Sequence, residues 1–209
     1  EEAMTDQNPT ALSRRQFMTA TAAVAASATM QKYALGGSAS KPNSNFSGVQ
    51  IGAITYSFRS MPGSAEDILK YACRCGLSSI ELMGGPAERF AGLPAGGGRR
   101  RGRMTAEQKK AQQKRQENLL NWRLSVSMDK YRALRKLYND AGVKIHIVKF
   151  GSIGNAGMSD AEIDYYFNVA KALGAKGITR EISEQAAERL GSVADKHKIM
   201  IGFHNHTER

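Results

Sequence analysis

The feature that most constrains the fold is a regular alternation, from residue 49 onward, of short apolar segments with longer amphipathic ones. Short runs rich in Val and Ile predict strands, and apolar residues at helical spacing predict helices. Repeated strand–helix alternation predicts a parallel sheet covered by helices. The predicted strands are 49–56, 79–82, 143–148, 176–181 and 199–207, and the predicted helices are 65–75, 105–122, 128–141, 159–173 and 184–197.

Two parallel architectures fit this alternation. A doubly wound sheet that binds a dinucleotide needs a glycine-rich phosphate loop after its first strand, and Ser57-Phe58-Arg59-Ser60 has no glycine. A barrel is favoured, although it needs eight strands and about 250 residues. We therefore predict an α/β fold, a (β/α)8 TIM barrel of which only about the first five β/α units are present.

The N-terminal segment resembles an export signal. Ser13-Arg14-Arg15-Gln16-Phe17-Met18 resembles the twin-arginine motif, and an Ala-rich run over 19–30 and small residues at 36–40 follow it. The run is too short and too rich in Ala and Thr for a membrane anchor. We predict a signal peptide and linker over 1–46, a twin-arginine translocase as partner during export, and a periplasmic or extracytoplasmic location. A disordered tail with a chance Arg-Arg pair would also fit this segment.

The basic charge is concentrated in one segment. The formal net charge is +11, which at first suggests a nucleic-acid partner. Residues 96–123, however, hold nine Lys or Arg against two Glu, so the basicity is mostly local and no nucleic acid is predicted as a partner. We predict that 47–209 is a partial barrel with a basic insertion at 84–126, made of a loop over 84–103 and a polar helix. The insertion is either a lid or basic rim over the site, or a solvated arm.

Strand parity brings several polar side chains to one place. Side chains alternate between the two faces of a strand, and the more apolar face is expected to meet the helices. Ile145 and Ile147 would then face the helices, and His146 would face the barrel interior. The same rule turns four side chains inward at the carboxyl ends of their strands, where barrel chemistry is located: Glu81, Glu181, His204 and His206.

Carboxylates and imidazoles that converge in this way suit either of two chemistries. They form a mixed oxygen and nitrogen ligand set for a metal ion, and they can abstract a proton next to a carbonyl. Each residue also has a structural interpretation. A strand-end Glu is often ion-paired, and His146 could be a hydrogen-bonded core histidine.

Five short stretches together resemble the sugar phosphate isomerase/epimerase family, with its xylose isomerase-like TIM barrel. They are Glu81, Trp122-Arg123, Asp140-Ala141-Gly142-Val143-Lys144-Ile145, Thr179-Arg180-Glu181 and Gly202-Phe203-His204-Asn205-His206. The resemblance spans about 48–208, and its His-Asn-His stretch is the most distinctive part. Exported members of this family with twin-arginine signals fit the N-terminus.

The resemblance implies an acid/base reaction on a sugar or polyol, assisted by a divalent metal ion such as Mn, Mg, Co or Zn. It implies Glu181 and Glu81 as catalytic residues, His204 as a metal ligand, and His206 and His146 as substrate-binding residues. Related epimerases hold the metal by a Glu on the fifth strand and by Asp, His and Glu on the next three. His204 stands where that first Glu would be, and the other ligands would lie beyond Arg209. We therefore expect the chain as given to lack the full metal site and activity.

Four functions remain as hypotheses. The leading one is an exported sugar, sugar phosphate or polyol isomerase or epimerase that works by metal-assisted proton transfer next to a carbonyl. The second, a keto-sugar or keto-inositol lyase or dehydratase, would begin with the same proton abstraction. The third is nucleic-acid processing of the endonuclease IV type, and the fourth is a non-catalytic sugar-binding barrel. Whether the protein forms a homo-oligomer is left open.

Overall fold

A computed structural model describes residues 40–94 and 104–205 of the chain. The predicted twin-arginine motif, the triple glycine and triple arginine at 96–101, and His206 lie outside the described residues. The elements below all belong to the compact unit Lys41–Arg209.

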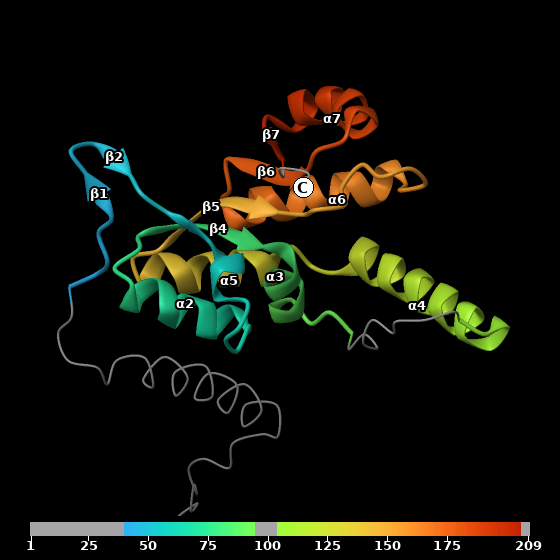
Figure 1. The fold of residues 1–209 in the computed structure, drawn as a ribbon, viewed down its shortest axis with the longest axis horizontal. Coiled ribbons are helices and arrows are strands. Elements are labelled where there is room, and N and C mark those ends of the chain that lie inside the picture. Colours follow the sequence, from blue (N-terminus) through green and yellow to red (C-terminus); the bar gives the residue numbers. More distant parts are fainter. Residues whose placement is uncertain (1–39, 95–103, 206–209) are drawn as a thin grey trace, which may run out of the picture. The chain divides into compact units, whose positions relative to one another are not determined.

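Five parallel strands form the central sheet (Figure 1). Their spatial order follows the sequence, so each connection moves one strand along in the same direction. Right-handed crossovers in a constant direction place the helices on one face, as in a β/α barrel, whereas a doubly wound sheet reverses its order. The predicted α/β class and partial barrel are confirmed. The strands are β3 Ala53–Ile54, β4 Ser79–Met83, β5 Lys144–Lys149, β6 Gly177–Glu181 and β7 Met200–His204.

The helices begin and end largely where the capping residues indicate. Ser64 Oγ accepts a hydrogen bond from Asp67 N at 3.0 Å, and Ser159 Oγ accepts one from Glu162 N at 3.2 Å. Gly174 ends a helix with φ of 74°, a conformation that glycine adopts without strain. The helices are η1 Thr55–Phe58, α2 Ala65–Arg74, α3 Gly84–Phe90, α4 Ala106–Ser125, α5 Asp129–Asp140, α6 Asp160–Leu173 and α7 Glu184–His197. No helix in the described part of the chain has both the length and the apolar character to cross a membrane.

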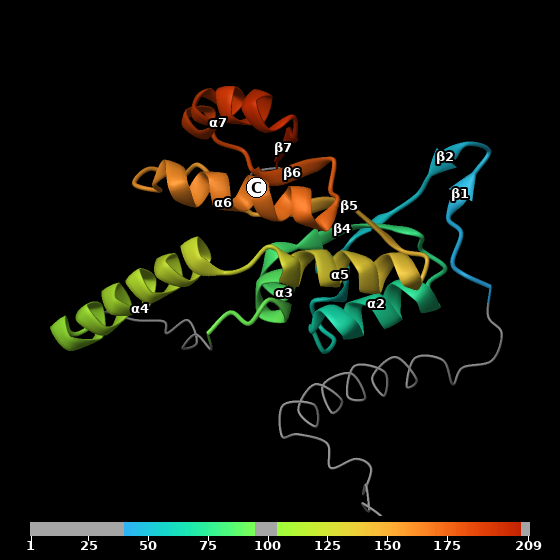
Figure 2. The same cartoon turned by 180° about the vertical axis from the view of Figure 1, so that it is seen from behind.

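The hydrophobic core lies between the sheet and these helices. Helices α5 and α6 lie on the side of the sheet that faces the viewer in Figure 2. Tyr138 of α5 is fully buried, and its hydroxyl donates to Ala65 O at 2.6 Å, which joins α5 to the start of α2. Apolar strand residues with at most 1% exposure cover the helix-facing side of the sheet: Ile80, Leu82, Val148 and Ile178.

The first predicted strand is interrupted, so a single strand over 49–56 is wrong. Val49–Gln50 forms β2, which pairs antiparallel with β1, Asn45–Phe46. A short break then precedes β3. Thr55 Oγ1 accepts a hydrogen bond from Met83 N at 2.9 Å, so the chain leaves the sheet there and continues as η1.

The expected loop over 84–103 is also wrong at its start, because α3 occupies Gly84–Phe90. Gly84 and Pro86 suggested a break in regular structure, but both fit a first helical turn. Pro86 is the third residue of α3, where a backbone N–H has no intrahelical partner to lose. A Cβ on Gly84 would lie 2.2 Å from the Phe150 ring, so glycine permits α3 to start against the end of β5.

Candidate functional site

A β-bulge in β5 decides which side chains reach the site. Ile80 pairs with Ile145, but Glu81 pairs with Ile147, so His146 is an additional residue in β5. After the bulge the faces of β5 are exchanged, and Ile147 lies on the face of Glu81 while Val148 lies on the helix-facing side. The prediction that Ile147 faces the helices is therefore wrong, because strand parity does not continue through a bulge.

The bulge brings Lys149 to the interior face at the carboxyl end of β5. Lys149 is the register partner of Met83 on one side and of Thr179 on the other. Its Nζ lies 2.8 Å from Glu181 Oε1, and the Lys149 side chain is 7% exposed while that of Glu181 is 43% exposed. This half-buried ion pair was missed in the sequence, where Lys149 appeared only as the residue after an apolar strand.

Glu81 and Glu181 face the same side but lie at different depths. Glu81 is level with Ile147 and Gly177, whereas Glu181 is four residues further along β6 and level with His204. Thr179 lies between them, and its hydroxyl donates to Glu81 Oε1 at 2.5 Å. Thr179 therefore contacts Glu81, and Lys149, its register partner in β5, contacts Glu181.

The three histidines are placed differently. His204 is exposed and pairs in register with Glu181, so it lies on the interior face as expected. His146 lies half-buried at the bulge, and its ring makes no hydrogen bond within the described part of the chain. His206 lies outside the described residues. The substrate-binding roles of His146 and His206 stay predictions.

A buried arginine fixes the loop beside Glu181. Arg180 is 3% exposed on the helix-facing side of β6, and it donates to the carbonyl oxygens of Glu181 and Ile153. Burial lowers the pKa of Arg180, and the charge of Glu181 partly opposes this shift. The loop that follows β5 is thereby held against β6, where Gly151 O accepts from Glu181 N at 3.4 Å.

The described side chains do not fit a divalent metal ion. Within residues 40–94 and 104–205, no three His, Cys, Asp or Glu side chains are grouped so that they could hold one. Glu181, the carboxylate nearest to His204 in register, is already bonded to the Lys149 ammonium group. Glu81 lies in a deeper layer. His204 as a metal ligand therefore stays a prediction.

Known proteins resemble this chain in structure only. No protein-family model matches the sequence, and no curated protein matches it. An uncharacterised protein from Parabacteroides distasonis is 17% identical, with a TM-score of 0.47 over 75% of this chain and 53% of its own. The probable 3-DHS dehydratase AsbF of petrobactin synthesis from Bacillus anthracis is 13% identical, with a TM-score of 0.45 over 74% and 52%. A sugar phosphate isomerase/epimerase from P. distasonis is 15% identical, with a TM-score of 0.43 over 79% and 54%.

The chain spans about half the length of these solved structures. Their named activities are properties of those proteins. Chemistry in this chain must therefore be inferred from its own residues, above all from Lys149 and Glu181.

Proposed function

We propose that this chain carries part of the active site of a sugar or polyol isomerase or epimerase, in which Glu181 moves a proton at a carbon next to a carbonyl. The observation that carries the proposal is the Lys149–Glu181 ion pair, 2.8 Å long, at the carboxyl end of the parallel strands. This end of a β/α barrel is where catalytic groups are found. The pair is also open to solvent on the side of Glu181.

A carboxylate beside an ammonium group suits proton abstraction next to a carbonyl. Glu181 would take the proton, and negative charge would then develop on the carbonyl oxygen. Lys149 has three N–H donors and gives one to Glu181, so the others are available to stabilise that oxygen. Thr179 is level with Lys149, and its hydroxyl donates to Glu81 in the next deeper layer.

A divalent metal ion would need ligands besides the described side chains, so no step is assigned to it. We further propose export through the twin-arginine translocase to a periplasmic or extracytoplasmic location, as the N-terminal motif indicates.

Deuterium exchange tests the proposal. The full-length protein is incubated in D2O with a panel of aldoses, ketoses and keto-polyols, and deuterium at the carbon next to the carbonyl is measured by NMR. We expect exchange in the wild type and a loss of about 100- to 10,000-fold in Glu181→Gln, the usual contribution of a general base. Glu188→Gln, an exposed position on α7, is the matched control and should exchange like the wild type.

Two results would contradict the proposal: no exchange with any substrate, or equal exchange in Glu181→Gln and the wild type. Product mass separates two outcomes of the same first step. In ordinary water, a product of unchanged mass indicates isomerisation or epimerisation, and a product that has lost water indicates a dehydratase.

A further inference from the structure

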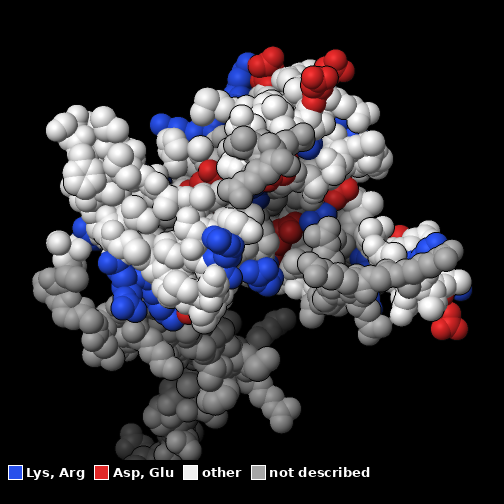
Figure 3. Space-filling model, viewed as in Figure 1, with Lys and Arg blue, Asp and Glu red and all other residues white. Residues whose placement is uncertain are grey.

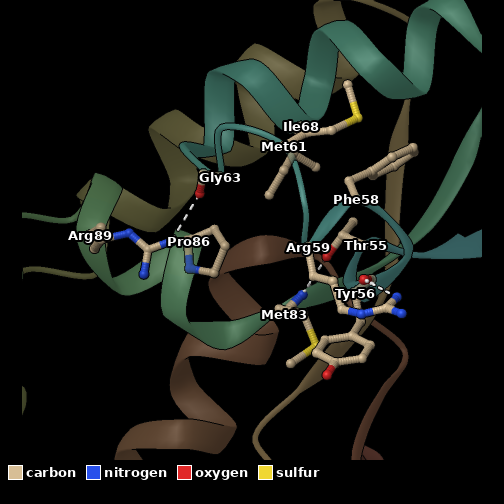
Figure 4. A pocket seen from close by; sticks show the side chains of 10 residues that line it. All are labelled: Thr55, Tyr56, Phe58, Arg59, Met61, Gly63, Ile68, Met83, Pro86 and Arg89. Carbon is tan, nitrogen blue, oxygen red and sulfur yellow. Dashed lines mark hydrogen bonds between the residues drawn. The ribbon is translucent and has the colours of Figure 1, made fainter. Parts of the chain in front are cut away.

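A cavity lies beside this site, at the carboxyl ends of β3 and β4. It has a volume of about 200 Å³ and lies between η1, the segment before α2, and α3 (Figure 4). Pockets for complete drug-sized ligands measure about 300–1,000 Å³. The cavity therefore has room for one end of a small ligand.

The walls of the cavity combine an apolar surface with two guanidinium groups. Arg59 and Arg89 lie on different walls, and Figure 4 shows Arg89 beside Gly63 and Arg59 beside Tyr56. None of the described residues that line the cavity is acidic. The apolar wall is formed by Phe58, Met61, Ile68, Met83 and Pro86.

Both guanidinium groups keep donors for a ligand. Arg89 Nη2 donates to Gly63 O at 2.8 Å, and Arg59 Nη1 donates to Tyr56 O at 3.4 Å. The Arg59 guanidinium also lies 4.8 Å from the centre of the Tyr56 ring. Each arginine has five N–H donors in a fork that matches an oxyanion, so most of them remain available. Figure 3 shows basic side chains beside a hollow on the face that Figure 1 presents.

We propose that this cavity binds an oxyanion, a carboxylate or a phosphate, of a small ligand whose carbon framework lies on the apolar wall. The inference rests on the proposed function in one respect, because it takes the ligand to be the substrate. Met83 lines the cavity and is the register partner of Lys149 in the next strand. Neighbouring strands are about 4.8 Å apart, so the cavity wall and Glu181 on β6 are about 10 Å apart across the sheet. One small molecule can span that distance with its charged end in the cavity and its carbonyl at Glu181.

Calorimetric titration of the full chain with phenyl phosphate tests the cavity without requiring turnover. We expect binding by the wild type, and about tenfold weaker binding in each of Arg59→Gln and Arg89→Gln, the effect of losing one charge-assisted hydrogen bond. Arg74→Gln, an exposed arginine at the end of α2, is the matched control and should bind like the wild type. Phenol, which lacks the charge, should bind at least tenfold more weakly than phenyl phosphate. Benzoate and inorganic phosphate then show which oxyanion is preferred and whether the apolar wall contributes.

Methionine methyl groups report where the probe binds. In a 13C-methyl methionine NMR titration, Met61 and Met83 should shift, and Met200, exposed on β7, should not. Unchanged affinity in both arginine variants, or a shift of Met200 without Met61 and Met83, would overturn the proposal.

Oxyanion binding in the cavity and proton transfer at Glu181 are two proposals that can be contradicted separately. Binding that depends on Arg59 and Arg89, without deuterium exchange on any sugar, would support the oxyanion site and contradict the proposed reaction. Exchange on an anionic substrate with an unchanged KM in both arginine variants would support the reaction and contradict the oxyanion site.

Discussion

Two groups of charged side chains in this molecule have opposite surroundings. The helix-layer cluster consists of Glu88 on α3, Arg123 on α4, and Glu162 and Tyr165 on α6. The strand-end pair consists of Lys149 and Glu181 on the interior face of the sheet. Each joins a cation to a carboxylate, yet the first is enclosed and the second is accessible.

The helix-layer cluster is saturated with hydrogen bonds. Arg123 Nε lies 2.8 Å from Glu88 Oε1, and Arg123 Nη1 lies 2.7 Å from Glu162 Oε1. Tyr165 donates to Glu88 Oε1 at 3.1 Å. Burial alone would lower the pKa of Arg123, but its bonds to Glu88 and Glu162 raise it; burial raises the pKa of Tyr165. Such a cluster ties α4 to α3 and α6 and offers no open position to a substrate.

The strand-end pair is less enclosed, because only its cation is buried. Lys149 is 7% exposed, and Glu181 is 43% exposed. A substrate can therefore reach the carboxylate while the sheet holds the ammonium group in place. The comparison indicates that access, rather than the presence of an ion pair, separates a candidate catalytic centre from a structural one.

The largest effect on stability is expected in the helix-layer cluster. Arg123→Met would leave Glu88 buried and Glu162 half-buried without their cation, and such a loss costs about 3–5 kcal/mol in typical buried pairs. Urea denaturation monitored by circular dichroism measures this change. Lys136→Met, which removes the exposed pair with Asp140, should change stability by less than about 0.5 kcal/mol. A loss below about 1 kcal/mol in Arg123→Met would show that the cluster is not structural.

A smaller loss of stability is expected at the strand-end pair. Lys149→Met removes a buried cation but leaves a carboxylate that water can solvate, so we expect a loss of about 1 kcal/mol. Deuterium exchange should fall much further, because the oxygen that becomes negative loses its nearest cation. Urea denaturation and the exchange assay on the same preparation separate the two effects. If this variant were as unstable as Arg123→Met, with exchange intact, the contrast between the two groups would be wrong.

Residues in regular strands could be placed from the sequence. In β6 and β7 the alternation is unbroken, so Glu181 and His204 were correctly expected on one face. In β5 the alternation is broken at His146, and nothing in a run of apolar residues indicates which position forms a bulge. Because this additional residue exchanges the faces of the later residues in β5, Lys149 was not expected on the interior face, where it forms half of the candidate site.

Glycine and proline were ambiguous for a related reason. Gly84 and Pro86 suggested a loop, because both residues commonly interrupt helices. In the structure, Gly84 permits close contact with Phe150, and Pro86 stands in the first turn of α3. The role of Gly84 depends on Phe150, which follows β5 and lies 66 residues later in the chain, so local sequence cannot reveal it.

The smallest effect on stability is expected at the contact between the partly exposed carboxylate of Asp164 and the buried ring of His197. Asp164 Oδ1 lies 2.6 Å from His197 Nε2, and His197 joins α7 to α6. The hydrogen bond from His197 lowers the pKa of Asp164, Lys196 adds to the shift, and burial opposes it. The folded state therefore favours ionised Asp164. Its contribution is fully present above the unfolded pKa of about 3.9, and it is lost as the pH falls through the lower folded pKa.

Urea midpoints at pH 5, 4 and 3 test this contribution. Asp164→Asn should lose less stability than the wild type over this range, by at most about 1 kcal/mol, because the carboxylate is partly exposed and screened by solvent. Asp129→Asn removes a more exposed pair with Arg132 and should follow the wild type closely. A pH dependence in Asp164→Asn identical to that of the wild type would show that the His197 contact contributes nothing. A difference larger than the loss in Lys149→Met would contradict this order of effects, because the Asp164–His197 contact would then contribute more to stability than the Lys149–Glu181 pair.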